Sequence, residues 1–315
     1  MLYWKIPLIV VSVALLITVA TSLVCFFMTF YSSKRKQKKK TQSPAPGGKV
    51  YDPYRTQILD WIREVRELPY KDLTITSFDG LTLKGAYYEF YKDAPTEILF
   101  HGYRGNSIRD LSGGVIRCRT LGHNALLVDH RACGRSEGRI ITFGAKESRD
   151  CVAWAHYFAK EINPDSKIIL TGISMGAATV LTAASMDLPE QVIGILADCG
   201  YTSTKEIVQK VMKEDMGLPP KLLYPFAKLS ALVIGRFNPD KTSPEKSMAR
   251  CRLPVLFFHG DADDFVPCYM SERNYEVCAS AQKRLVITPS AGHGLCFPVD
   301  QETYLREMRE FFHTI

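Results

Sequence analysis

The chain has 315 residues, 46% of them hydrophobic, which is enough to bury one large core. A chain of this length can hold two domains, but α/β proteins often reach it as one domain with a small insertion. The first 48 residues carry seven of the 40 Lys and Arg residues and no acidic residue, leaving 33 basic residues to balance all 33 acidic ones. The net charge of +7 therefore belongs to one tail, and no nucleic-acid partner is expected.

Residues 6–31 form a long uncharged, mostly apolar run near the N-terminus. As a helix, this run is long enough to cross about 30 Å of hydrocarbon. A cleaved signal peptide is the alternative, but its apolar region is usually only about 7–15 residues long and lacks a basic cluster after it. We predict that residues 1–33 are an uncleaved, single-pass anchor in the cell membrane.

The basic residues indicate which way this anchor is oriented. One Lys precedes the run, and six Lys or Arg follow within residues 34–40. The positive-inside rule places this cluster and the domain after it in the cytoplasm, the alternatives being the extracellular face or secretion after cleavage. Eight scattered cysteines beyond the run favour reduced thiols and agree with a cytoplasmic domain. Residues 34–50 are expected to be a basic stop-transfer flank and a flexible linker.

The remaining chain, residues 51–315, alternates between strand and helix patterns. Residues 51–67 favour a helix, and residues 73–78 and 81–90 favour two strands joined by a tight Asp79-Gly80 turn. Buried strands are predicted at residues 97–100, 125–128, 167–170, 192–197, 255–258 and 285–287. Amphipathic stretches such as 146–159 and 176–186 lie between them. We therefore predict an α/β fold: a mostly parallel sheet with helices on both faces.

One long interval, at about residues 201–249, breaks this alternation. It contains two expected helices, at residues 205–215 and 221–234, separated by Gly217-Leu218-Pro219-Pro220. We interpret it as a small helical cap over a site at the sheet edge. A decorative surface insertion is the alternative, but the apolar character of residues 222–234 indicates that they pack on something.

The strand at residues 167–170 leads into Gly172-Ile173-Ser174-Met175-Gly176 and then an Ala-rich helix. This is the G-x-S-x-G pattern in the strand–turn–helix setting that a nucleophilic serine needs. Small residues two positions either side of Ser174 let strand and helix approach closely, and the helix N-terminus stabilises nearby negative charge. The alternative role for Ser174 is to cap that helix.

A serine nucleophile needs a base and an acid that orients the base. His293 lies between two glycines just after the last strand, and Asp263 follows the strand at residues 255–258. These two complete the chain order Ser174, Asp263, His293 that is expected for such a fold. Turn or capping roles are assigned to Asp261 and Asp264, and structural turns to His101 and His259.

Backbone N–H groups must stabilise the oxyanion that forms when the serine attacks. The amide of Met175, directly after the nucleophile, is one expected donor. The amide of Tyr103, in the loop after the strand at residues 97–100, is the other. Arg104 in the same loop is either a surface residue or a group that binds an acidic part of the substrate.

Together these motifs resemble bacterial membrane-anchored α/β-hydrolases of the serine aminopeptidase-like and prolyl-oligopeptidase-like group. The chain is most similar to small Firmicutes members with an H-G-Y-x-G-N oxyanion motif. The matching segments are 101–106, 129–138, 172–176, 198–201, 259–267 and His293. Ala132 departs from this pattern, because it stands where the D-x-R-G-x-G-x-S-x-G loop has its first Gly. The resemblance implies hydrolysis of an ester, thioester or amide through an acyl-enzyme.

From these observations we expect a serine hydrolase that cleaves an acyl bond, with a carboxyl ester as the favoured bond, in a small acyl-bearing substrate. An aminopeptidase-like serine peptidase is the second hypothesis, with Glu206, Glu214 and Asp215 as candidates to hold a substrate ammonium. A catalytically silent binding protein at the membrane is the third. No metal or organic cofactor is expected, and the sequence leaves the oligomeric state open.

Overall fold

The computed structural model describes residues 5–33 and 45–313. An eight-stranded sheet lies at its centre, in the order β1-β2-β4-β3-β5-β6-β7-β8. In this spatial order β1, β2 and β4 pair antiparallel. Every later pair, from β4 with β3 to β7 with β8, is parallel. The predicted mostly parallel sheet is therefore confirmed. The strands are β1 Lys71–Thr76, β2 Thr82–Tyr88, β3 Thr96–Phe100, β4 Asn124–Val128, β5 Ile168–Ile173, β6 Val192–Asp198, β7 Val255–Gly260 and β8 Lys283–Thr288.

Strands β1 and β2 form the hairpin that the sequence predicts. They pair antiparallel up to Thr76 opposite Thr82. In the turn, Gly80 has a φ of +85°, a conformation that favours glycine, and the Leu81 N–H donates to Ser77 Oγ at 2.8 Å. Local turn chemistry thus sets the register at this edge of the sheet.

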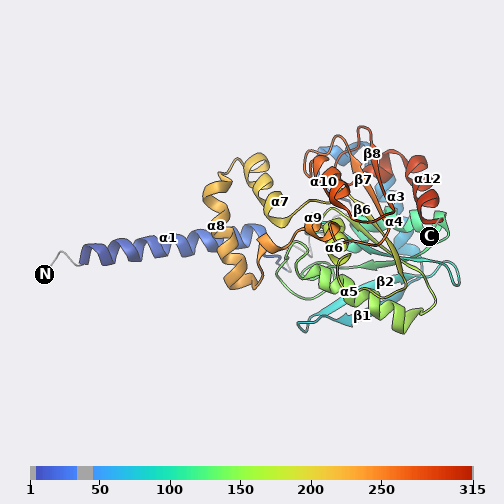
Figure 1. Ribbon diagram of the computed structural model, residues 1–315, viewed down its shortest axis with the longest axis horizontal. Coiled ribbons are helices and arrows are strands. Elements are labelled where there is room, and N and C mark those ends of the chain that lie inside the picture. The colour runs from blue at the N-terminus through green and yellow to red at the C-terminus, as the bar shows by residue number, and fades with distance from the viewer. Residues whose placement is uncertain (1–4, 34–44, 314–315) are drawn as a thin grey trace.

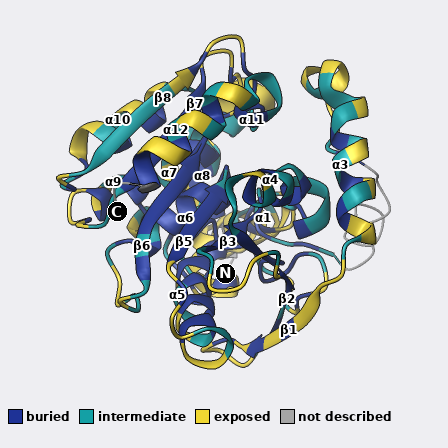
Figure 2. Ribbon diagram, turned by 90° about the vertical axis from the view of Figure 1, so that its right-hand side faces the viewer, coloured by how far each residue is buried: buried dark blue, intermediate teal, exposed yellow. Residues whose placement is uncertain are grey.

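Helices cover both faces of the sheet, as Figure 2 shows by the dark blue strands enclosed between them. Successive side chains of a strand point to opposite faces, so Phe257 packs in one apolar cluster with Trp154, and Phe258 packs in another with Tyr304. The covering helices are α3 Arg55–Glu67, α4 Ser107–Leu121, α5 Glu147–Tyr157, α6 Met175–Ala183, α9 Pro244–Met248, α10 Tyr269–Val277, α11 Cys296–Val299 and α12 Gln301–His313.

Two further helices, α7 Thr204–Lys210 and α8 Pro220–Ser230, lie between β6 and β7. Each continues into one π-helical turn, Val211–Asp215 after α7 and Ala231–Gly235 after α8. These helices are present where the sequence predicts them. Figure 1 shows them beyond one edge of the domain, on the side from which α1 projects. We refer to α7, α8 and their π-helical turns as the cap.

Helix α1, Lys5–Thr29, projects from the domain as one long rod (Figure 1). Its segment Pro7–Thr29 is long and apolar enough to cross a membrane. The end of α1 is packed into the protein, because Phe26 and Phe30 are buried in the apolar cluster that includes the cap. The Ile141 N–H also donates to the Phe30 carbonyl at 2.8 Å. The N-terminal helix is therefore joined directly to the folded domain.

The predicted basic flank at residues 34–40 lies outside the described residues. The described part of the predicted linker, residues 45–50, belongs to the folded domain. Ala45 is buried, and a 3₁₀ helix over Lys49–Tyr54 leads into α3. The side chain of Tyr51 in this segment reaches the site described below.

Candidate active site

Ser174 lies on a sharp turn between β5 and α6. Its φ of +58° and ψ of −117° are strained for a residue with a side chain, and its N–H donates to the Asp198 carbonyl at 2.8 Å. A Cβ at position 172 would lie 2.2 Å from the Gly176 carbonyl carbon, and one at position 176 would lie 1.9 Å from the Phe100 oxygen. Both glycines are therefore required, as the sequence predicts. The Ser174 side chain makes no capping bond to α6, so the capping alternative is wrong.

The structure brings Ser174, His293 and Asp263 together in a chain of hydrogen bonds. His293 Nε2 lies 2.9 Å from Ser174 Oγ, and His293 Nδ1 lies 2.7 Å from Asp263 Oδ2. Because a carboxylate can only accept, Nδ1 carries the proton and Nε2 is free to accept the serine hydroxyl proton. Tyr51 donates to the His293 carbonyl at 2.9 Å and helps hold the loop. The geometry is that of a nucleophile, a base and an orienting acid.

Asp263 is held as a carboxylate by its surroundings. Its Oδ1 accepts the N–H groups of Phe265 and Val266 at 2.9 and 2.8 Å, and its Oδ2 lies 3.3 Å from His259 Nε2. Burial opposes ionisation, but the hydrogen bonds from His259 and His293 outweigh it and hold the pKa of Asp263 well below its ordinary value. The carboxylate is therefore charged when it orients the His293 ring.

His259 has a larger role than the structural turn that the sequence predicts. Its Nδ1 is 2.6 Å from Ser271 Oγ, and its Nε2 donates to the Val266 carbonyl at 2.8 Å. These bonds fix the ring against Asp263. The signal for this contact was present in the sequence, because His259 lies near the end of a strand, four residues before Asp263.

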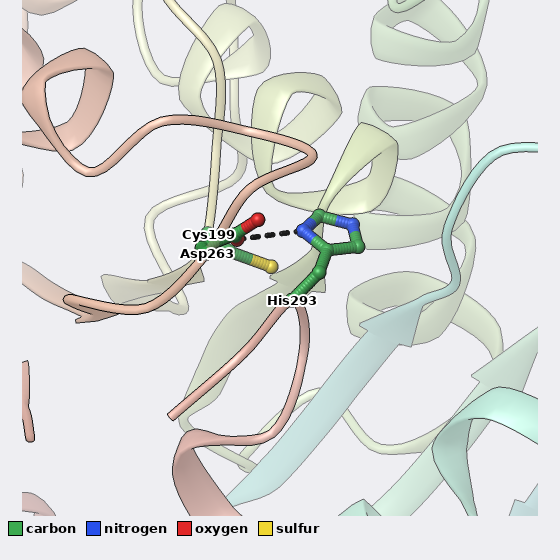
Figure 3. A group of neighbouring side chains, drawn as sticks. All are labelled: Cys199, Asp263 and His293. Atoms are coloured by element: carbon green, nitrogen blue, oxygen red, sulfur yellow. Dashed lines mark hydrogen bonds and ion pairs between the residues drawn. The ribbon is translucent and has the colours of Figure 1, made fainter. Parts of the chain in front are cut away.

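Cys199, Asp263 and His293 form a group whose ligand atoms all lie within 4.8 Å of one another (Figure 3). Metal–ligand bonds of about 2.0–2.3 Å would hold such atoms apart around the ion. Here the 2.7 Å separation of His293 Nδ1 and Asp263 Oδ2 is a direct hydrogen bond. The arrangement fits proton transfer better than metal binding.

The loop after β3 passes beside the serine. A Cβ at position 102 would lie 3.6 Å from Ser174 Cβ. His101 is buried and shapes this loop: its Nδ1 donates to the Gly102 carbonyl at 2.8 Å, and its Nε2 accepts the His130 N–H at 3.1 Å. Tyr103 and Met175 line a cavity together with Ser174. Both residues thus lie beside the nucleophile, and the role of their amides as oxyanion donors stays a prediction.

Arg104 is partly exposed in this loop, and it makes contacts that the sequence does not indicate. Its Nη2 donates to the carbonyls of Met28 and Tyr31 at 2.9 and 2.8 Å, at the end of α1. The adjacent Tyr103 hydroxyl donates to the Thr29 carbonyl at 2.6 Å. A cation at a helix C-terminus satisfies carbonyls that lack partners within the helix. The sequence could not show this contact, because it joins segments more than 70 residues apart.

Two cavities meet at Ser174. The larger, about 490 Å³, is bordered by Tyr51, Trp61, Phe297 and the ion pair of Arg109 with Asp110. The smaller, about 260 Å³, has a mostly apolar lining that includes Met28 at the end of α1, Val208 and Met212 of the cap, and Phe265 from the loop after β7. A substrate with one apolar arm and one more polar arm fits this division.

Two further kinds of group named from the sequence are Asp261 and the cysteines. Asp261 Oδ1 accepts the Ser290 N–H at 2.6 Å, which is the turn role predicted for it. All nine cysteines are free, and eight of them are buried. The expectation of reduced thiols agrees with this.

Comparisons with known proteins agree with this fold. A family model described as "alpha/beta hydrolase fold" matches residues 98–233. The uncharacterized protein YqkD of Bacillus subtilis is 28% identical over 237 residues, which is 75% of this chain and 77% of YqkD. The yeast protein YNL320W, named a membrane protein, is 24% identical over 78% of this chain and 80% of its own length.

Among solved structures, the esterase Pf2001 of Pyrococcus furiosus superimposes with a TM-score of 0.65 at 23% identity, covering 80% of this chain and 94% of the esterase. At this identity the likeness shows the fold alone. The sheet order, the serine turn, the matching family model and these similarities together show that the chain has the α/β-hydrolase fold.

Proposed function

We propose that this chain is a serine hydrolase that cleaves a carboxyl ester through an acyl-enzyme on Ser174. The observation that carries the proposal is the hydrogen-bonded chain from Ser174 through His293 to Asp263. An esterase among the structures of the same fold adds support. The subgroup of membrane-anchored bacterial hydrolases is part of the proposal, and helix α1 and the Bacillus relative favour it.

In the first half of the reaction, Ser174 Oγ bonds to the acyl carbon while its proton moves to His293 Nε2. The carbonyl electrons move onto the oxygen, which accepts hydrogen bonds from the Tyr103 and Met175 amides. The intermediate collapses as the C–O bond to the alcohol breaks, and the departing oxygen takes the proton from Nε2. Asp263 stays ionised throughout and stabilises the charged imidazole.

In the second half, a water molecule gives a proton to His293 Nε2 as its oxygen attacks the acyl-enzyme. The bond from the acyl carbon to Ser174 Oγ then breaks, and Oγ takes the proton back. The balance is one ester and one water consumed, and one acid and one alcohol released. The protein groups that take part in these steps are side chains and backbone amides of this chain.

The peptidase alternative is weaker because the acids that would hold a substrate ammonium already have partners. Glu206 binds Arg273 at 2.9 Å, and its carboxylate also accepts from Thr202 and Tyr269. Lys210 lies 3.2 Å from Asp215 and 3.7 Å from Glu214. A substrate amine would have to displace these cations. A silent binding protein has no need of the aligned proton path at Ser174.

The test is a substrate panel for the purified full-length protein: aryl esters of acids with short and long chains, and aminoacyl anilides. Ester turnover that disappears in Ser174→Ala is the expected result. Anilide turnover without ester turnover would establish the peptidase instead. No turnover of either class would favour the silent binding protein. Ser203→Ala, at a serine that caps α7 outside the proton path, is the control and should keep ester turnover.

A further inference from the structure

Helix α8 and the π-helical turn after it have two apolar faces. The inner face buries Tyr224, Ala227 and Ala231 against the rest of the protein. The outer face exposes a second row of large apolar side chains, with Val233 at 68% exposure, and the row is Leu222, Leu229, Leu232 and Val233. A helix at a water-facing surface normally has one apolar face and one polar face. We refer to the exposed row as the outer stripe.

The outer stripe lies on a helix that packs against α1, whose own surface is exposed and apolar. The two helices pack together, and Cys25 Sγ of α1 lies 4.0 Å from the Leu223 carbonyl of α8. Residues 5–24 of α1 precede this contact and rise about 30 Å, which is the thickness of the hydrocarbon core. If α1 crosses a membrane, α8 therefore lies at the level where hydrocarbon meets the lipid headgroups.

The charges around the outer stripe fit that level. Residues 216–238 contain three basic residues and no acidic residue. Lys221 and Arg236, near the two ends of the stripe, are both exposed. Long basic side chains beside an apolar helix face are typical of helices that lie at a membrane surface, where they reach the headgroups.

The smaller cavity opens beside this surface. Its lining includes three side chains that are also exposed and apolar: Met28 at the end of α1, Met216 after α7, and Phe265. These three form an apolar rim. An acyl chain leaving the lipid layer next to α1 would meet this rim before reaching Ser174, with little polar surface to cross.

We propose that the outer stripe lies in the interfacial layer of the membrane, and that the substrate is an ester taken from this layer, its acyl chain filling the smaller cavity. The substrate class rests on the proposed esterase function; the membrane contact does not. A single-chain lipid ester such as a monoacylglycerol has the required chemistry. Its polar alcohol would occupy the larger cavity, near the ion pair of Arg109 and Asp110.

The membrane contact is tested by fluorescence quenching of the full chain in phosphatidylcholine vesicles that contain brominated acyl chains. Val233→Trp introduces a reporter on the outer stripe. Val277→Trp, at an exposed position on α10, is the matched control. Quenching of the signal added by Val233→Trp, but not of that added by Val277→Trp, is expected. Equal quenching of the two would overturn the membrane contact. The signal of the three native tryptophans is subtracted by measuring the wild-type chain.

The substrate class is tested by comparing two esters in the same vesicles: a monoacylglycerol in the bilayer and a water-soluble short-chain aryl ester. In Leu222→Asp/Val233→Asp, the rate on the bilayer ester should fall about ten-fold, because charged side chains resist the interface. The rate on the soluble ester should stay within about two-fold, as should both rates in the control Val277→Asp, since exposed substitutions perturb the fold little.

Equal loss on both esters, or no loss on either, would contradict uptake from the lipid layer. Soluble-ester turnover without any bilayer-ester turnover in the wild type would also contradict it. If the wild type hydrolyses neither ester, the proposed function fails, and the substrate class with it. The quenching result still decides the membrane contact.

Discussion

The hydroxyl of Tyr103 donates a 2.6 Å hydrogen bond to the backbone carbonyl of Thr29, the last residue of α1. Tyr103 is also the residue whose amide is expected to stabilise the oxyanion. One residue therefore joins the end of the N-terminal helix to the loop beside the nucleophile. Arg104 reinforces the joint by binding two more carbonyls of the same helix end.

Removing the Arg104 cation should weaken this joint. Arg104→Gln should lower the free energy of unfolding by about 1–2 kcal/mol, because charge-assisted hydrogen bonds to the end of α1 are lost. Thermal unfolding in detergent measures the change, and kcat/KM should fall a few-fold as the loop loosens. Arg63→Gln, which breaks only an exposed ion pair with Asp60, is the control and should have almost no effect. An Arg104→Gln protein as stable and active as wild type would refute a structural role for the joint.

The orienting acid is tested by Asp263→Asn. The amide keeps the size of the side chain but cannot hold His293 in the required tautomer as a carboxylate does. The expected loss in kcat is about 10⁴-fold, with the fold retained. Asp261→Asn, two residues away in the same loop, should stay within about three-fold, because that side chain binds only a turn amide. Similar losses in both variants would point to general damage of the loop.

The smaller cavity should set the acyl-chain preference. Met212 is buried in its lining, and Met212→Trp fills part of the space. The ratio of kcat/KM for an octanoyl ester to that for an acetyl ester should drop by at least about ten-fold, because displaced methylenes each forfeit about 0.8 kcal/mol of burial. Ile58→Trp in the larger cavity is the matched control and should leave the ratio unchanged. If only the control changes the ratio, the acyl chain occupies the larger cavity.

A buried ion pair beneath the site should make the stability of the fold depend on pH in the acidic range. Burial of Glu97 opposes its ionisation, but Arg117 and His123 beside it outweigh this and lower its pKa from 4.5 to about 2. A lowered folded-state pKa means that the stabilisation is complete above about pH 4.5 and is lost as pH falls toward 2. Denaturant unfolding across this range should show the loss in wild type.

In Glu97→Gln, that acid-dependent loss should be much smaller. The variant should also be less stable at neutral pH by about 3–5 kcal/mol, because Arg117 is left as a buried charge without its partner. If the stability of Glu97→Gln depends on pH in the same way as that of the wild type, another group controls this dependence.

If α1 crosses a membrane, its orientation is open to a direct test. The basic cluster at residues 34–40 predicts that the domain faces the cytoplasm. A reporter enzyme that is active only in the cytoplasm, fused after Ile315, should be active in cells. A reporter that is active only outside should be silent. The opposite pattern would place the domain on the outer face.

Local patterns were sufficient to predict the strands, the serine turn and the residues that meet there. Each of Ser174, Asp263 and His293 follows its own strand, and the ends of parallel strands meet at one edge of the sheet. The strain at Ser174 and the close approach of Gly172 and Gly176 also follow from the G-x-S-x-G pattern. These features depend on neighbours in sequence or on the rules of sheet topology.

Contacts between distant segments could not be predicted in this way. Nothing near Arg104 in the sequence indicates that it binds the end of α1, and nothing near Tyr51 indicates that it reaches His293. From the sequence, residues 222–234 could be recognised only as apolar. Which of them are buried and which form the outer stripe depends on what α8 packs against. Ala132 stands where the D-x-R-G-x-G-x-S-x-G loop has its first Gly. It adopts the left-handed conformation that favours glycine, with a φ of +60°.

The central claim is that Ser174 Oγ is the nucleophile, and active-site labelling tests it most directly. The full-length protein is treated with a fluorophosphonate probe, digested, and mapped by tandem mass spectrometry. A single phosphonyl adduct on Ser174 is predicted, absent in Ser174→Ala and greatly slowed in His293→Ala, which lacks the base. No adduct on the wild type, an adduct on another residue, or equal labelling of Ser174→Ala would contradict the account.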